Sequence, residues 1–74
     1  MSTFDQIQEI LCVQLDLDPK LVQPETTLDE LGADSVDMVD LAMTIEDEFQ
    51  IEVPEEDLEN MKTVADVVSF VDSR

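Results

Sequence analysis

The sequence predicts an all-α fold: a small bundle of three principal helices plus one short helix, with a long loop between helices one and two. Three observations support this fold class. Apolar residues recur at helical spacing, capping residues precede the helical segments, and the chain has one cysteine and no histidine. That composition excludes a disulfide framework within the chain and the usual Cys/His zinc sites. The 74 residues are therefore expected to form one domain, 1–74, that is held together by helix packing and has no metal site.

The first helix is expected over Thr3–Leu15. Ser2 precedes it, and Asp5 follows three residues later, which is the spacing of a capping box. Its apolar residues share one face: Phe4, Ile7, Ile10, Leu11, Cys12 and Leu15. Cys12 is expected to pack there as a small, reduced, apolar side chain.

A long connection, residues 16–34, follows and contains the only glycine of the chain, Gly32. Apolar residues are spaced through it and are expected to hold it on the bundle: Leu17, Leu21, Val22, Leu28 and Leu31. A helical turn is predicted over residues 28–31. Because unstructured connections of this length are uncommon in compact domains, a functional role for the loop is indicated.

Two further helices are expected near the end of the chain. Pro54 ends an extended stretch at 50–53, and a short helix is predicted over Glu55–Asn60. Thr63 and Asp66 have the spacing of a second capping box and mark the start of the last helix. Its apolar face is made of Val64, Val67, Val68, Phe70 and Val71.

The second helix, from Asp34 or Ser35 to about Phe49, has more apolar residues than one face requires. At about 100° per residue, one compact stripe would face the core: Met38, Leu41, Ala42, Ile45 and Phe49. A second stripe points well away from it: Val36, Val39 and Met43. Either the loop or the short helix covers this second stripe, or the stripe is an exposed docking surface with a charged rim.

Charge limits the possible partners. The formal net charge is −17, and 14 of the 20 acidic residues lie between Glu25 and Glu59. Nucleic acid and anionic membranes would repel such a chain, so basic protein surfaces are the expected partners. The first residues lack a signal-peptide pattern, and no apolar run is long enough to cross a bilayer. A cytoplasmic monomer is therefore expected.

Ser35 lies at the first turn of the second helix. One reading is that Ser35 or Asp34 is simply the N-cap. A nucleophilic serine is not favoured, because the chain has no histidine to act as a base and lacks the second glycine of a nucleophile elbow. The position also suits a covalently attached phosphate, since free backbone N–H groups and the helix dipole favour an anion there.

The stretch LGADSVDMVDL, residues 31–41, resembles the attachment motif of acyl carrier proteins. The segments IEDEF (45–49), IEVPEE (51–56) and TVADV (63–67) extend the resemblance over essentially the whole chain. Val36 departs from the leucine that usually follows the serine, but it keeps an apolar side chain. The resemblance implies a carrier and not an enzyme, with a 4'-phosphopantetheine arm from coenzyme A attached to Ser35.

The resemblance further implies that acyl chains travel on this arm as thioesters to the enzymes of fatty-acid synthesis. The partners would be a phosphopantetheinyl transferase (holo-carrier synthase), ketosynthases, malonyl transferase, reductases, dehydratase and acyltransferases. The expected partner surface comprises Asp34, Val36, Asp37, Val39, Asp40, Met43, Glu46, Asp47, Glu52, Val53 and Glu55. The expected acyl-chain lining is Leu41, Ile45, Phe49 and Val67. Carriers for polyketide, peptidyl or D-alanyl transfer remain open, as does an unmodified acidic interaction module.

Overall fold

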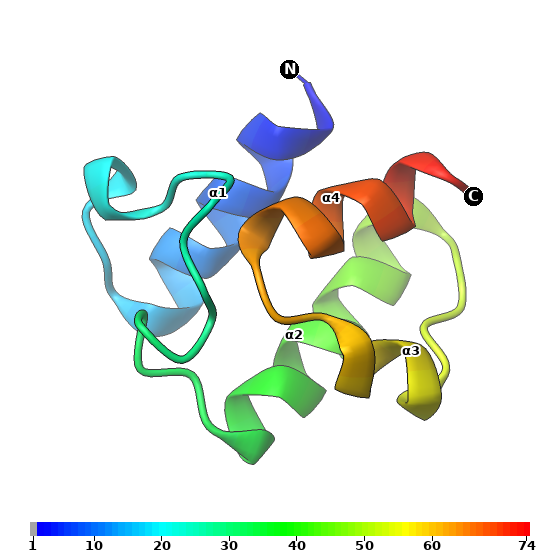
Figure 1. Ribbon diagram of the computed structural model, residues 1–74. Helices are drawn as coiled ribbons and strands as arrows, with labels where there is room; N and C mark the ends of the chain where they lie inside the picture. Colours follow the sequence, from blue (N-terminus) through cyan, green and yellow to red (C-terminus); the bar gives the residue numbers. More distant parts are fainter. Residues whose placement is uncertain (1) are drawn as a thin grey trace.

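The computed structural model describes residues 2–74, and this part of the chain is helical (Figure 1). The elements are α1 (Thr3–Leu15), η1 (Pro19–Leu21), α2 (Ser35–Phe49), α3 (Glu55–Asn60) and α4 (Val64–Asp72). The three principal helices and the short one predicted from the sequence are confirmed. Residues 2–74 contain no β-strand, only an isolated bridge between Thr27 and Thr63. Within the same residues, no helix has the length and apolar character needed to cross a membrane.

The core lies where α1 packs against α2 and α4. Its most deeply buried side chains are at most 1% exposed and come from these three helices and the loop: Ile7, Leu11, Val22, Leu41, Ile45, Val64 and Val67. Every core residue among residues 2–74 is apolar. Full burial of one such side chain contributes about 1.5–3 kcal/mol, so the packing of these helices is the main source of stability.

Capping boxes begin the three principal helices. Ser2 caps α1 with Asp5, and Thr63 caps α4 with Asp66, as the sequence predicts. The two ends of the chain also meet, because Thr3 Oγ1 donates a hydrogen bond to Asp72 Oδ1 at 2.5 Å. Figure 1 accordingly shows the start of α1 and the end of α4 on the same side of the bundle.

The long loop between α1 and α2 is held on the bundle by the buried side chains of Val22 and Leu28 and by hydrogen bonds to its main chain. The side-chain amide of Gln8 donates to the carbonyl oxygens of Pro19 (2.9 Å) and Val22 (3.0 Å). Farther along, the loop pairs with the segment that leads into α4, where the Leu28 N–H donates to the Lys62 carbonyl at 2.9 Å. The loop therefore forms a fixed wall beside α2.

Three details of the loop differ from expectation. Leu21 is 57% exposed, so the prediction that it helps to hold the loop down is wrong, whereas Val22 and Leu28 are buried. The predicted helical turn at residues 28–31 is a hydrogen-bonded turn outside any helix, and Gly32 follows it at φ 84°, a conformation that favours glycine. The short helix η1 was not predicted; Asp18 caps it and Pro19 begins it.

Cys12 is half-buried on α1, in agreement with a packing role. Burial raises the pKa of its thiol, and the charge of Asp18 raises it further. A protonated thiol behaves as a small apolar group, so Cys12 packs like its apolar neighbours on α1.

Candidate functional site

Ser35 is the first residue of α2, and its side chain is exposed. The capping role belongs to Asp34. Its Oδ1 accepts the N–H of Asp37 at 3.0 Å, and the Asp37 carboxylate accepts the N–H of Asp34 at 3.1 Å. Of the two caps that the sequence allowed, the structure selects Asp34. The Ser35 hydroxyl takes no part in this capping box and faces solvent.

The turn that carries Ser35 is fixed from two sides. Before it, the carbonyl of Leu28 accepts the N–H groups of Leu31 and Ala33, both at 3.1 Å. From α1, the Gln14 side-chain amide donates to the Asp37 carbonyl at 2.8 Å in a partly buried position. Ser35 therefore projects from a rigid helix end rather than from a mobile loop.

The second apolar stripe of α2 is exposed. Val36 is 68%, Val39 52% and Met43 54% exposed, so neither the loop nor α3 covers them. The first stripe points inward as predicted, with Leu41, Ala42 and Ile45 buried. Of the two readings that the sequence left open, the exposed surface is the one found.

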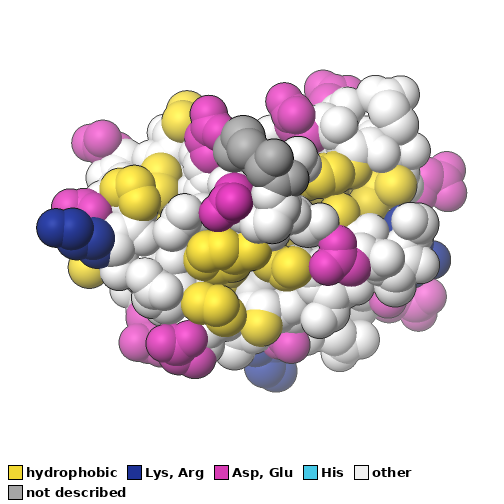
Figure 2. All heavy atoms as spheres, turned by 90° about the horizontal axis from the view of Figure 1, so that it is seen from above, with side chains coloured by type: hydrophobic (Ala, Val, Ile, Leu, Met, Phe, Trp, Pro, Cys, Tyr) yellow, Lys and Arg dark blue, Asp and Glu magenta, His cyan; other side chains and the backbone are white. Residues whose placement is uncertain are grey.

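Carboxylates surround this stripe, but they are not equivalent. The exposed ones are Asp34, Asp40, Asp47, Glu52 and Glu55. Asp37 and Glu46 are half-buried and hold structural hydrogen bonds, Asp37 in the capping box and Glu46 through the N–H of Val53. Figure 2 shows the molecule from above, where apolar patches lie among carboxylates and a few basic side chains.

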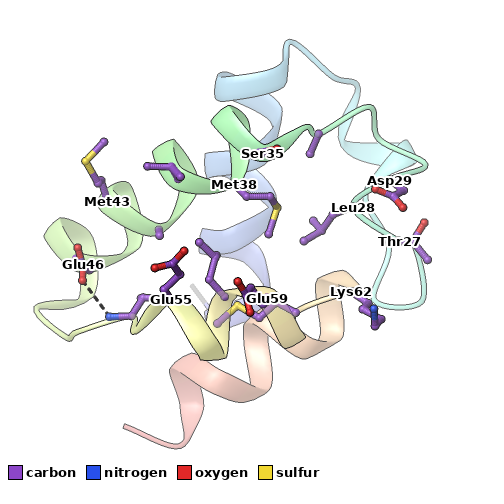
Figure 3. A pocket seen from close by; sticks show the side chains of 16 residues that line it. Thr27, Leu28, Asp29, Ser35, Met38, Met43, Glu46, Glu55, Glu59 and Lys62 are labelled. Atoms are coloured by element: carbon purple, nitrogen blue, oxygen red, sulfur yellow. Dashed lines mark hydrogen bonds between the residues drawn. The ribbon is translucent and has the colours of Figure 1, made fainter.

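An open pocket of about 890 Å³ begins beside Ser35 and lies between α2 and α3 (Figure 3). Met38 of α2 and Leu28 of the loop point into it. Its lining comprises Thr27, Leu28, Asp29, Ala33, Ser35, Met38, Val39, Ala42, Met43, Glu46, Val53, Glu55, Leu58, Glu59, Met61 and Lys62. Val39 and Met43 belong to both the pocket and the exposed stripe, so the two features are continuous.

The four residues expected to line an acyl chain are not part of this pocket. Leu41, Ile45 and Val67 are buried in the core, Phe49 is half-buried at the end of α2, and none of the four lines the pocket. Helical periodicity could have pointed to Met38 and Ala42, since it places both on the inward stripe. The contribution of α3 could not be read from periodicity, because it depends on how far α3 stands from α2.

Val53 also differs from expectation. It was grouped with the partner surface as an apolar extension near α3, but it is only 8% exposed and lines the pocket. Glu52 and Glu55 on either side of it are exposed. The extension of the surface toward α3 is therefore a pair of carboxylates without an apolar centre.

Comparison with known proteins agrees with this geometry. A family model described as the phosphopantetheine attachment site matches residues 5–71. The chain is 43% identical to the acyl carrier protein of Bdellovibrio bacteriovorus over 100% of this chain and 96% of that protein. It is 42% identical to the acyl carrier protein of Wolinella succinogenes over 99% and 97% of the two chains.

The structural comparison agrees with the sequence comparison. The crystal structure of an acyl carrier protein from Thermotoga maritima superposes with a TM-score of 0.81 at 33% identity, covering 93% of this chain and 81% of that one. Matches of this extent in both sequence and structure, together with an exposed serine at the start of α2, lead to one conclusion: the chain belongs to the acyl carrier protein family.

Proposed function

We propose that the chain carries acyl groups as thioesters on a 4'-phosphopantetheine arm bound to the Oγ of Ser35, and that it delivers them to enzymes of fatty-acid synthesis. The observation that supports this most directly is the position of Ser35. Ser35 is exposed, its hydroxyl takes no part in the capping box, and the residue lines a pocket with apolar and charged walls.

The residues around Ser35 suit a phosphodiester. Attachment forms a bond between the Ser35 oxygen and phosphorus and releases adenosine 3',5'-bisphosphate from coenzyme A. The free N–H groups and the positive dipole end of α2 favour the negative charge that results. Asp34 and Asp37 carry the nearest carboxylates. Their repulsion of the phosphate is partly offset because each accepts a backbone N–H.

The pocket is the proposed first site for the acyl chain. Some of its apolar residues come from α2 and others from the α3 side, among them Met38, Ala42, Val53, Leu58 and Met61. A chain that entered beside Ser35 would be removed from water along this wall. A longer chain would have to displace core side chains to reach Leu41, Ile45, Phe49 or Val67.

The exposed stripe and its carboxylates are the proposed docking surface. Val36, Val39 and Met43 supply apolar contact beside the attachment point, while the surrounding negative charge attracts basic partner surfaces. Steering by charge speeds encounter, and a small interface permits quick release. These properties suit a carrier that visits a transferase and then ketosynthases, malonyl transferase, reductases, dehydratase and acyltransferases in turn.

Intact-mass measurement tests the attachment. The unmodified protein is incubated with coenzyme A, Mg²⁺ and a phosphopantetheinyl transferase, next to a Ser35→Ala variant whose helicity is checked by circular dichroism. The expected result is the gain of one phosphopantetheinyl group by the wild-type chain and none by the variant. No gain in either protein, or the same gain in both, would overturn the proposal.

A further inference from the structure

Glu46 is one of the carboxylates near the exposed stripe, and it also makes a structural hydrogen bond. It is half-buried on α2, and its Oε2 accepts the N–H of Val53 at 3.0 Å (Figure 3). Glu46, Val53 and the neighbouring Glu55 all line the pocket. The hydrogen bond therefore joins α2 to the segment leading into α3, at one wall of the pocket.

Besides this bond, α3 is attached mainly by the buried side chains of Val53 and Met61 and by half-buried Leu58. It has six residues, and Pro54 at its N-cap offers no side-chain hydrogen bond. It packs on the other helices less extensively than α1 packs on α2 and α4. A polar contact at the far side, between Arg74 and Asp57, is 3.8 Å long and about 40% exposed, and such exposed pairs contribute little.

The Glu46 bond differs from that ion pair in two respects. It is partly buried, and its acceptor is charged, which makes the hydrogen bond stronger than one between neutral groups. Val53 is 8% exposed, so its N–H would lack both its partner and ready access to water if Glu46 lost its acceptor oxygen. Removal of that oxygen should therefore loosen the segment before α3.

We propose that Glu46 is a positioning residue that closes the pocket wall: its carboxylate oxygen holds the segment before α3 against α2. The acceptor atom matters for this role, and the negative charge seen by partners is secondary. The link to acyl groups rests on the proposed function, since it takes the acyl chain as the occupant of the pocket.

Amide hydrogen exchange of the unmodified protein tests the hydrogen bond. Three variants are compared with wild type: Glu46→Ala removes the acceptor, Glu46→Gln keeps an acceptor oxygen without the charge, and Glu48→Ala removes an exposed neighbouring charge. We expect the Val53 amide to exchange at least about tenfold faster in Glu46→Ala. Glu48→Ala should change its rate by less than about threefold, and Glu46→Gln, which keeps a neutral acceptor, should raise it less than Glu46→Ala does.

Three results would overturn the proposal. One is an unchanged Val53 rate in Glu46→Ala. Another is an equal rise in Glu46→Gln, which would assign the effect to charge. The third is an equal rise at the core amides of Leu11 and Ile45, which would indicate a general loss of stability in place of a local opening.

A second measurement tests the closing of the pocket. In the acylated protein, the reaction of the thioester with hydroxylamine reports how well the chain is sheltered. We expect this reaction to be severalfold faster in Glu46→Ala, with Glu46→Gln between wild type and Glu46→Ala; equal rates in wild type and Glu46→Ala would refute the pocket-closing role. If Ser35 never accepts the arm, the proposed function fails, while the Val53 exchange still decides the role of Glu46.

Discussion

The side-chain amide of Gln14 in α1 donates a hydrogen bond to the main-chain carbonyl of Asp37 in α2, at 2.8 Å. Asp37 lies two residues after Ser35, in the same first turn of the helix. The bond thus ties the turn that presents the serine to the most extensively packed helix of the bundle. Presentation of Ser35 depends on α1 as well as on α2.

Gln14→Ala should therefore lower the free energy of unfolding by about 1 kcal/mol, the usual net value of one hydrogen bond. Urea denaturation measures this. Gln23→Ala is a matched control, because its amide donates to the Lys20 carbonyl at an exposed position. Equal losses in the two variants would contradict the importance of the partly buried bond.

Asp34 caps α2 and Ser35 does not, so substitutions at these adjacent positions should affect stability differently. Asp34→Ala removes the N-cap and should cost about 1 kcal/mol. Ser35→Ala should stay within about 0.5 kcal/mol of wild type, because Ser35 is exposed and does not cap the helix. Thermal unfolding of both variants checks this; a loss in Ser35→Ala as large as that in Asp34→Ala would make the serine part of the cap.

The exposed stripe should matter to partners and not to folding. Val39→Glu should raise the KM of a phosphopantetheinyl transferase about fivefold or more, since apolar contact next to Ser35 is lost, with little change in unfolding free energy. Leu21→Glu is the control: Leu21 is 57% exposed on η1 and lies outside the stripe. If Leu21→Glu raises KM equally, added negative charge rather than the stripe explains the effect.

Added salt should raise the melting temperature. The net charge is −17, and among residues 2–74 one carboxylate, that of Asp57, forms an ion pair, with Arg74. Salt screens the repulsion between carboxylates and so favours the compact state. Calorimetry in increasing NaCl measures the effect, and a flat or falling melting temperature would contradict it.

The hydrogen bonds of Asp66 predict that part of the stability of the protein depends on pH. Its carboxylate accepts the N–H groups of Thr63 and Lys62, both at 3.0 Å, and these bonds lower its pKa. A lowered pKa contributes stability above the unfolded value, about 4, and that stability is lost as the pH falls through the folded value. The stability advantage of wild type over Asp66→Asn should therefore be full at pH 7 and shrink below about pH 4. An advantage that is the same at both pH values would contradict this assignment.

The helices could be predicted from the sequence because their signals are local. Ser2 with Asp5 and Thr63 with Asp66 are three residues apart, so a capping box is visible without any knowledge of the fold. The exposed stripe on α2 followed from helical periodicity, and its carboxylate rim followed from composition. What periodicity left open was whether another element covers the stripe, since that depends on the path of a long loop.

The pocket could not be predicted for the same reason. Its walls combine α2, the loop near Leu28 and the residues around α3, whose spacing is set by tertiary packing. Glu46 and Val53 are seven residues apart, across the end of a helix and an extended segment, so no helical repeat relates them. Sequence reasoning therefore assigned both to the partner surface, whereas the structure joins them at the pocket wall.

Among residues 2–74, no polar or charged side chain is buried in the core. A hydrocarbon guest that entered this core would thus leave no core side chain without a hydrogen-bond partner, and resistance within the core would come from lost packing contacts and displaced methyl groups. That resistance grows smoothly with each added methylene and has no chemical threshold. The energetic cost of placing an acyl chain in the core therefore depends on the volume of the chain, which suits a carrier whose acyl chain grows in steps.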